Sequence, residues 1–208
     1  MKAVDAKKKL LEHSVKLIEE EGLGALSFRE MARRAGVSHQ APYHHFENRD
    51  GILAALALEG FRQLDDMLVK AAADGTGKSA EEVLRAMMAA YVTFALDRPV
   101  HFRIMFRPEL VEVEKYPEAQ AVAAQTFERF IEAVARCHPG VSRRSKPFTE
   151  RVNALWAATH GVATLWLDGN MKSITPGLSL PSFLAAATEL YARAGATPLA
   201  RSKPKTRR

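Results

Sequence analysis

Three of the seven histidines in this 208-residue chain lie within seven residues of one another. His39, His44 and His45 belong to the segment AGVSHQAPYHHFENRD, which runs from Ala35 to Asp50 and also contains a glutamine and a tyrosine. Imidazole, amide and phenol groups donate and accept hydrogen bonds in fixed directions. The segment is therefore suited to recognising the polar edges of another molecule, and its three histidines also raise the question of a metal ion.

Metal and catalytic chemistry find no support in the rest of the sequence. A zinc site needs a complete set of Cys, His or acidic ligands, and no cysteine or group of nearby acids completes one around the three histidines. The chain has no G-x-S-x-G motif, no P-loop and no pair of acids in one short motif. We therefore predict no bound metal, no cofactor, no catalytic residue and no enzyme activity.

The residues around the histidines predict two short helices. The sequence SFRE forms a capping-box pattern that predicts a helix over about residues 27–34. The sequence AGV predicts a turn, and Ser38 predicts the cap of a second helix over about residues 38–45. Pro42 lacks an N–H and disfavours helical angles in the residue before it, so we expect this second helix to start late or to bend.

Apolar residues recur at helical spacing through most of the chain, and no alternating strand pattern bounded by hairpin turns is present. Beyond the two short helices, the pattern predicts helices over about residues 4–21, from Asn48 to about Leu68, and over about 79–96, 99–106, 117–137, 145–168 and 181–194. The fold class predicted from the sequence is therefore all-α, with about nine helices.

Two short helices joined by a turn that contains glycine form a helix-turn-helix arrangement, whose second helix places its N-terminal residues in the DNA major groove. The sequence GLGALSFREMARRAGVSHQAPYHHFENRDGIL resembles the DNA-binding signature of the TetR family of bacterial transcriptional regulators. The resemblance extends over about residues 8–56. It implies a DNA-binding domain over residues 1–50 and an effector-binding and dimerisation domain over residues 51–196, followed by a tail over residues 197–208.

The resemblance also implies roles for individual residues. The side chains expected to meet base edges or thymine methyl groups are Arg29, His39, Gln40 and Tyr43. The side chains expected to contact phosphates are Ser27, His44, His45 and Arg49. Ser38, as the cap of the second helix, completes the predicted DNA-binding set. Arg49 replaces the lysine that is usual in the family, which keeps the charge and changes the donor geometry.

A second resemblance lies at ALWAATHGVATLWLDG, residues 154–169, which is similar to the C-terminal domain of a TetR subgroup named for its Trp, His and Gly (WHG). Aromatic and methionine side chains on the surrounding helices suit an adaptable apolar cavity, although the same residues at helical spacing also build solid cores. The candidate contacts of a small hydrophobic effector are Met88, Tyr91, His101, Met105, Phe127, Trp156 and His160.

The same segment mixes small and large apolar residues, which allows helices to cross closely. The resemblance implies that this helix and SFLAAATELYARA form a two-fold, four-helix bundle between two chains. A homodimer also suits DNA geometry, because recognition helices about 34–36 Å apart enter successive major grooves. The predicted dimer contacts are Ala158, Gly161, Leu165 and Leu184.

Charge and composition say little about the binding partner, but they favour a cellular location. The net charge is +6, but residues 201–208 contain five Lys/Arg and no acid, whereas residues 1–50 contain nine Lys/Arg and eight Asp/Glu. The tail from about residue 197 is predicted to be disordered. The lone cysteine, Cys137, fits a reducing cytoplasm and is interpreted as inert, and no apolar run approaches the roughly 18 residues of a membrane span.

Together these patterns predict a cytoplasmic, homodimeric regulator without a membrane partner. In this interpretation it is a repressor that binds a palindromic operator in double-stranded DNA and is released by a small hydrophobic effector. The alternative is an α-helical small-molecule-binding protein or enzyme whose N-terminal helix pair is purely structural.

Overall fold

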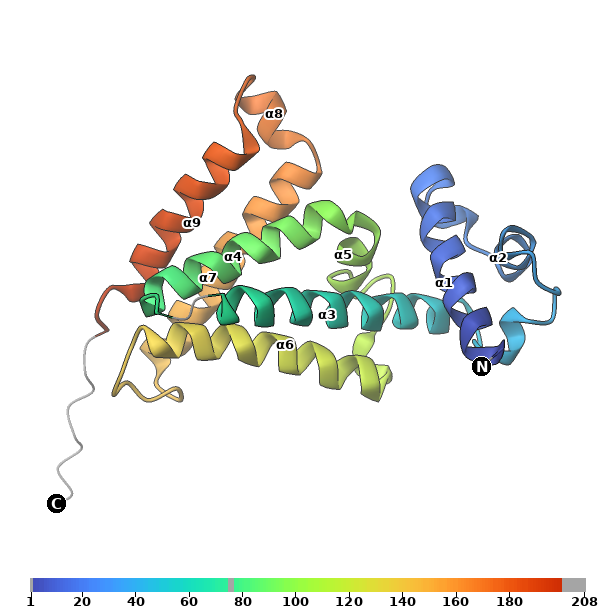
Figure 1. Cartoon of the computed structure of the whole chain (residues 1–208), viewed down its shortest axis with the longest axis horizontal. Coiled ribbons are helices and arrows are strands. Elements are labelled where there is room, and N and C mark those ends of the chain that lie inside the picture. The colour runs from blue at the N-terminus through green and yellow to red at the C-terminus, as the bar shows by residue number, and fades with distance from the viewer. Residues whose placement is uncertain (1, 75–76, 200–208) are drawn as a thin grey trace, which may run out of the picture. The chain divides into compact units, whose positions relative to one another are not determined.

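The computed structural model describes residues 2–74 and 77–199, and these residues are helical with no strand (Figure 1). The α-helices of the described residues are α1 (Lys2–Glu21), α2 (Phe28–Ala35), α3 (Arg49–Ala73), α4 (Ala80–Asp97), α5 (Pro99–Met105), α6 (Pro117–Arg136), α7 (Lys146–Leu167), α8 (Asn170–Ile174) and α9 (Leu180–Ala196). Three short 3-10 helices are η1 (Leu23–Ala25), η2 (Pro42–His44) and η3 (Val113–Lys115). The prediction of an all-α fold with about nine helices is confirmed.

The chain is divided into two compact units. The long helices α3 and α6 each begin in the first unit and end in the second. Of the described residues, the first unit contains 2–63 and 98–123, and the second contains 64–74, 77–97 and 124–199. Each unit buries its own apolar residues, as expected because helices are stabilised mainly by packing of their apolar faces.

In the first unit, α1 packs against α2, η1 and α5. Leu10 and Leu17 of α1 and Met31 of α2 are completely buried, and Phe46 after η2 is nearly so. Two side-chain caps are present. The Ser27 hydroxyl accepts a hydrogen bond from the Glu30 N–H at the start of α2, and the Asn48 side chain accepts one from the Gly51 N–H at the start of α3.

Gly60 lets α5 approach α3 closely within the first unit. A Cβ atom added at Gly60 would overlap the Met105 sulfur and lie 3.1 Å from the His101 Cβ. We expect Gly60→Ala to destabilise the protein by about 1–3 kcal/mol, because a packed core accommodates an added methyl group poorly. Thermal or urea unfolding measures this change. Gly51→Ala in the same helix is the control, since its Cβ would make only ordinary contacts, the nearest at 3.8 Å; equal effects of the two changes would contradict the prediction.

In the second unit, α4 lies against both α7 and α9. Leu84 and Phe94 of α4 and Phe148 of α7 are among the large side chains of its core. An ion pair joins the C-terminal part of α3 to α6, because the Arg129 guanidinium donates two hydrogen bonds to the buried Asp65 carboxylate, one of them 2.9 Å long. Pairing satisfies a carboxylate that would otherwise be costly to bury.

Most predicted helix boundaries differ from the observed ones by a few residues. Two differences are larger. The helix predicted over residues 38–45 is not an α-helix, and α8 was not predicted at all. Of the predicted tail, residues 200–208 lie outside the described residues. No helix in the described part of the chain has the length and apolar character to cross a membrane.

Candidate nucleic-acid interface

The candidate interface is built on α2, the turn that follows it and η2. The turn is made by Gly36, whose φ of 65° lies in the left-handed region that glycine adopts readily. The Gly36 N–H donates to the Arg33 carbonyl, and the Val37 N–H donates to the Ala32 carbonyl, 3.1 Å away. These bonds end α2 abruptly and direct the chain into the recognition segment, residues 38–46.

The recognition segment is a series of tight turns rather than the predicted α-helix over residues 38–45, and that prediction was wrong in this respect. Ala41 and Tyr43 donate their N–H groups to the carbonyls three residues earlier, and Pro42–His44 form a 3-10 helix. The physical reason is the buried Pro42, which has no N–H to donate to the Ser38 carbonyl. No side chain caps this 3-10 helix, so Ser38 does not have its predicted capping role.

The four side chains predicted to reach base edges line one surface depression of about 350 Å³. Arg29 comes from α2, and His39, Gln40 and Tyr43 come from the recognition segment. Tyr43 is 62% exposed, and its ring meets the edge of the Phe28 ring at a centroid distance of 4.6 Å. The Phe28 contact restrains an otherwise exposed aromatic side chain, so the depression presents donors and acceptors in a defined arrangement.

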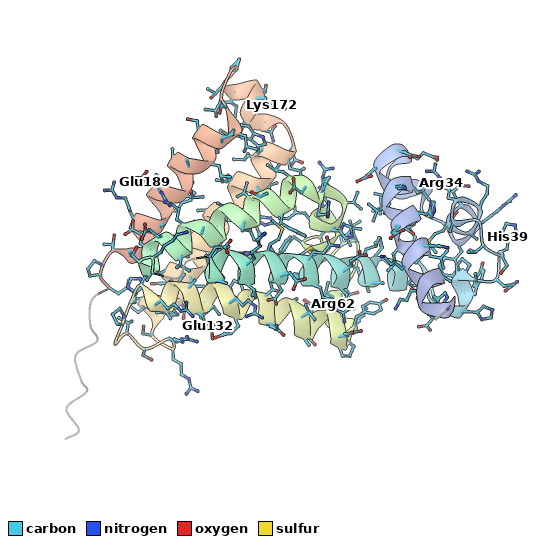
Figure 2. The ribbon with its side chains drawn as sticks, viewed as in Figure 1. Arg34, His39, Arg62, Glu132, Lys172 and Glu189 are labelled. Carbon is cyan, nitrogen blue, oxygen red and sulfur yellow. The ribbon has the colours of Figure 1, made fainter. Side chains whose placement is uncertain are left out.

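Arg29 is exposed and forms no hydrogen bond or ion pair with residues that the structure describes. Its guanidinium group is therefore available to a ligand. His39 is also exposed, in the turn between α2 and η2 (Figure 2). An unpaired cation beside planar polar groups is the composition that reads base edges in a DNA groove.

The residues predicted to contact phosphates do not line this depression, and two of them form hydrogen bonds within the protein. His44 is exposed, as is Ser38, which was predicted as a cap, whereas the half-buried His45 lies against Phe46 with ring centroids 6.3 Å apart. Ser27 is exposed, but its hydroxyl caps α2. The Arg49 side chain donates a 3.0 Å hydrogen bond to the Leu23 carbonyl, so it ties the start of α3 to η1. The DNA-binding roles of all these residues stay predictions.

An ion-pair cluster between α1 and α2 was not foreseen from the sequence. The Arg34 guanidinium, whose side chain is only 16% exposed, is bound by Glu20 and Glu21 of α1 and by Glu30 of α2. The position of Arg34 is shown in Figure 2. Arg33 donates a 2.9 Å hydrogen bond to Glu30. Because Arg33 and Arg34 are paired within the protein, Arg29 is the cation of α2 that has no partner among the described residues.

The cluster predicts a specific pH dependence of stability. Hydrogen bonds from Arg33 and then Arg34 lower the pKa of Glu30 from 4.5 to about 2. A lowered pKa in the folded state adds stability above pH 4.5, and this stability is lost as the pH falls through about 2. We expect Glu30→Gln to lower the unfolding temperature at pH 7 and the difference from wild type to shrink between pH 4.5 and 2. A difference that stays constant from pH 7 to pH 2 would contradict this assignment.

Four of the predicted effector contacts form one cluster in the second unit. The Tyr91 hydroxyl on α4 lies 2.8 Å from His160 Nδ1 on α7. The Trp156 ring lies 5.4 Å from the His160 ring and 6.1 Å from the Phe127 ring. Burial raises the pKa of Tyr91, and burial lowers the pKa of His160, so both groups are neutral at neutral pH.

The other predicted effector contacts lie elsewhere in the fold. Met88 is buried on α4 in the second unit. His101 and Met105 belong to α5 in the first unit, beside Gly60. His101 is 5% exposed, and neither of its ring nitrogens has a hydrogen-bond partner among the described residues. Its Nε2 lies 3.7 Å from a Glu59 carboxylate oxygen, and this neighbour is the main cause of a lowered pKa of Glu59.

The predicted dimer contacts lie on the outer faces of α7 and α9. Leu165 is 43% exposed, and Ala158, Gly161 and Leu184 are half-buried. Leu190 of α9, which the sequence did not single out, is the more exposed apolar side chain at 64%. It lies six residues after Leu184, about 120° around the helix from it, so helical periodicity did not group the two residues. Exposed leucines beside small residues form a surface suited to contact with another helix pair.

The remaining candidates for chemistry are a metal site and the lone thiol. The described residues contain no group of three or more His, Cys, Asp or Glu that could hold a metal ion. Cys137 is half-buried, its thiol lies 3.6 Å from the Ala133 carbonyl, and burial raises its pKa, which disfavours the reactive thiolate.

Comparison with known proteins relates both parts of the chain to one family. Residues 10–56 match the family described as "Bacterial regulatory proteins, tetR family", and residues 84–196 match "Tetracyclin repressor-like, C-terminal domain". The chain is 24% identical over 128 residues to the HTH-type transcriptional regulator Mb1846 of Mycobacterium bovis. The matched region covers 61% of this chain and 55% of Mb1846. It is 24% identical over 95 residues to YobS of Bacillus subtilis, an uncharacterized HTH-type transcriptional regulator. The matched region covers 46% of this chain and 48% of YobS. The chain thus spans about half the length of these curated relatives.

Solved structures share the fold over nearly the whole chain. A protein of unknown function from Rhodococcus sp. RHA1 superposes with a TM-score of 0.72 at 26% identity, covering 91% of this chain and 94% of that one. The TetR family transcriptional regulator PfmR of Thermus thermophilus superposes with a TM-score of 0.66 at 22% identity, covering 88% and 97%. By its helix-turn-helix unit and by both matched segments, the chain belongs to the TetR family of transcriptional regulators, which are not enzymes.

Proposed function

We propose that this protein is a ligand-responsive repressor that binds a palindromic operator as a homodimer. The observation that supports recognition of DNA bases most directly is one surface depression, which is lined by Arg29, His39, Gln40 and Tyr43. These groups have complementary roles, since arginine pairs with guanine, an amide pairs with adenine, and an apolar ring face contacts the thymine methyl group. Family membership supports the same function.

The dimer is proposed to form through the outer faces of α7 and α9. A two-fold dimer places two recognition segments on one side of the duplex, where half-sites about one helical turn apart face the protein. The exposed Leu165 and Leu190 supply apolar surface, and Ala158 and Gly161 allow close approach. We place Leu184 in the same interface.

The effector is proposed to bind at the cluster of Tyr91, Phe127, Trp156 and His160, with Met88, His101 and Met105 as further contacts. Aromatic rings around a few polar atoms are typical of small-molecule sites. Trp156, His160 and Gly161 are also the residues that support assignment to the WHG subgroup. In this mechanism the effector displaces the helix that begins near Asn48 and changes the separation of the two recognition segments, so that they no longer fit successive grooves.

The test of DNA binding uses the full chain and inverted repeats from the DNA that flanks its coding region. We expect one duplex to bind at least about 10³-fold more tightly than scrambled DNA, with affinity that falls as salt rises. Tyr43→Ala is expected to weaken specific binding about tenfold, since it removes an apolar base contact. Unchanged binding and salt dependence in this variant would favour a purely structural helix pair.

The effector proposal needs a separate measurement on the same protein and operator. A tenfold loss of operator affinity requires an effector that binds the released state about 1.4 kcal/mol more tightly. Operator affinity that stays flat across a broad panel of apolar compounds would count against a ligand-responsive repressor. The division into domains 1–50 and 51–196 and a cytoplasmic location belong to the same proposal.

A further inference from the structure

A narrow groove of about 120 Å³ lies in the second unit among the end of α3, the start of α4 and α6. Its apolar lining includes Leu68, Val69 and Ala72 of α3 and Val83 and Met87 of α4. Val69 is 42% exposed, so part of this apolar lining faces solvent. The groove is separate from the Tyr91 and His160 cluster, because none of the residues of that cluster lines it.

A wider hollow of about 380 Å³ adjoins the groove at the connection between α6 and α7. Glu132 and Arg136 line both cavities. His138 lines the wider hollow and is 4% exposed, and its Nε2 has no hydrogen-bond partner among the described residues. A buried ring nitrogen without a partner is unfavourable, and an acceptor atom in the hollow would remove that cost.

The charged side chains that border both cavities are Arg136 and Glu132, and Arg136 supplies a cation for an anionic ligand. Arg129 is bound to Asp65, and Arg143 is paired with Glu128 at 2.8 Å. Arg136 forms no ion pair with any residue in the described ranges. Of the arginines that line the cavities, Arg136 is therefore the one available to a ligand, and it borders the apolar groove and the His138 hollow together.

We propose that this site binds an aliphatic carboxylate. The acyl chain lies in the groove over Leu68, Ala72 and Met87, and the carboxylate accepts hydrogen bonds from Arg136 and His138. A ligand with one charged end and one apolar end matches the two cavities, whereas a free small anion would leave the groove empty. The site does not depend on the proposed operator or on the Tyr91 cluster.

Isothermal titration of the full chain tests the chemistry with hexanoate, hexanol and acetate. We expect hexanoate to bind and the other two to bind at least about tenfold more weakly, because each lacks one of the two contacts. From butanoate to hexanoate, affinity should rise about fourfold per methylene group until the groove is filled. Equal affinities for hexanoate and hexanol, or no binding of hexanoate, would overturn the proposal.

Variants test the location of the proposed site, because two of them are expected to change hexanoate affinity in opposite directions. Arg136→Ala should weaken hexanoate binding about tenfold, and Glu132→Gln should tighten it about threefold, because it removes a like charge beside the carboxylate. Ala72→Phe should block the acyl chain. Arg85→Ala, an exposed arginine of α4 that lines neither cavity, is the control and should bind as wild type does. Hexanoate affinity that is unchanged in the Arg136, Glu132 and Ala72 variants would overturn the proposed location. None of these measurements involves DNA, so they do not depend on the proposed function.

Discussion

Replacing Gly161 with glutamate is expected to leave the chain folded, convert the proposed dimer into a monomer and lower operator affinity at least about a hundredfold. A Cβ atom added at Gly161 meets no other atom within 4 Å in the single chain, so the variant has room to fold. In a two-fold interface the new carboxylate would be buried close to its own copy, and unpaired buried charges are strongly unfavourable. The loss in operator affinity follows because one half-site then binds without its partner.

Sedimentation velocity and operator titration measure the two effects on Gly161→Glu separately. Gly161→Ala is the matched control, and we expect it to stay dimeric with nearly unchanged affinity. Circular dichroism with an unfolding temperature close to that of wild type shows that the variant is folded. A glutamate variant that remains dimeric at micromolar concentration would place the interface elsewhere on the protein.

Arg29→Ala is expected to weaken specific operator binding by roughly 30-fold to 10⁴-fold. A bidentate contact between arginine and guanine contributes about 1–3 kcal/mol of discrimination, and a dimer makes it in both half-sites. Arg29 has no partner among the described residues, so its loss should leave the unfolding temperature unchanged. The measurement is operator titration at fixed salt, with scrambled DNA in parallel.

Arg33→Ala is the control for this change, because it removes the same charge from the same helix. The Arg33 side chain is bound to Glu30, so we expect less than about threefold loss of operator affinity from it. Equal losses in the two variants would mean that Arg29 contributes charge alone and does not read a base. A substituted base pair that abolishes the difference in affinity between wild type and Arg29→Ala would identify the position that Arg29 contacts.

Local signals predicted the fold well. The caps at Ser27 and Asn48 and the left-handed turn at Gly36 are interactions between residues close in the chain, so the sequence contains them directly. Pro42 was a correct warning about the recognition segment, but its effect was larger than expected. The segment NMKSI of α8 is one short turn of helix with two apolar residues, too few to show a helical period.

Contacts between distant residues were harder to predict. Arg34 is bound to residues 13 and 14 positions earlier, and neither helix alone shows which of its charges face the other. The candidate effector contacts show the same limit. Periodicity identified Tyr91 and His160 as inward residues, yet it gave no means of separating them from His101, which lies beside Glu59 on a different helix.

The bonds around Arg34 and Arg49 have a mechanical consequence for motion within the first unit. Arg34 fastens α2 to α1, and Arg49 fastens the beginning of α3 to η1, which follows α1. Tilting α2 alone would break several charged contacts at once, whereas moving these elements together breaks none of them. Any displacement of the beginning of α3 would therefore carry α1, η1 and α2 with it as one group and leave the contacts within that group intact.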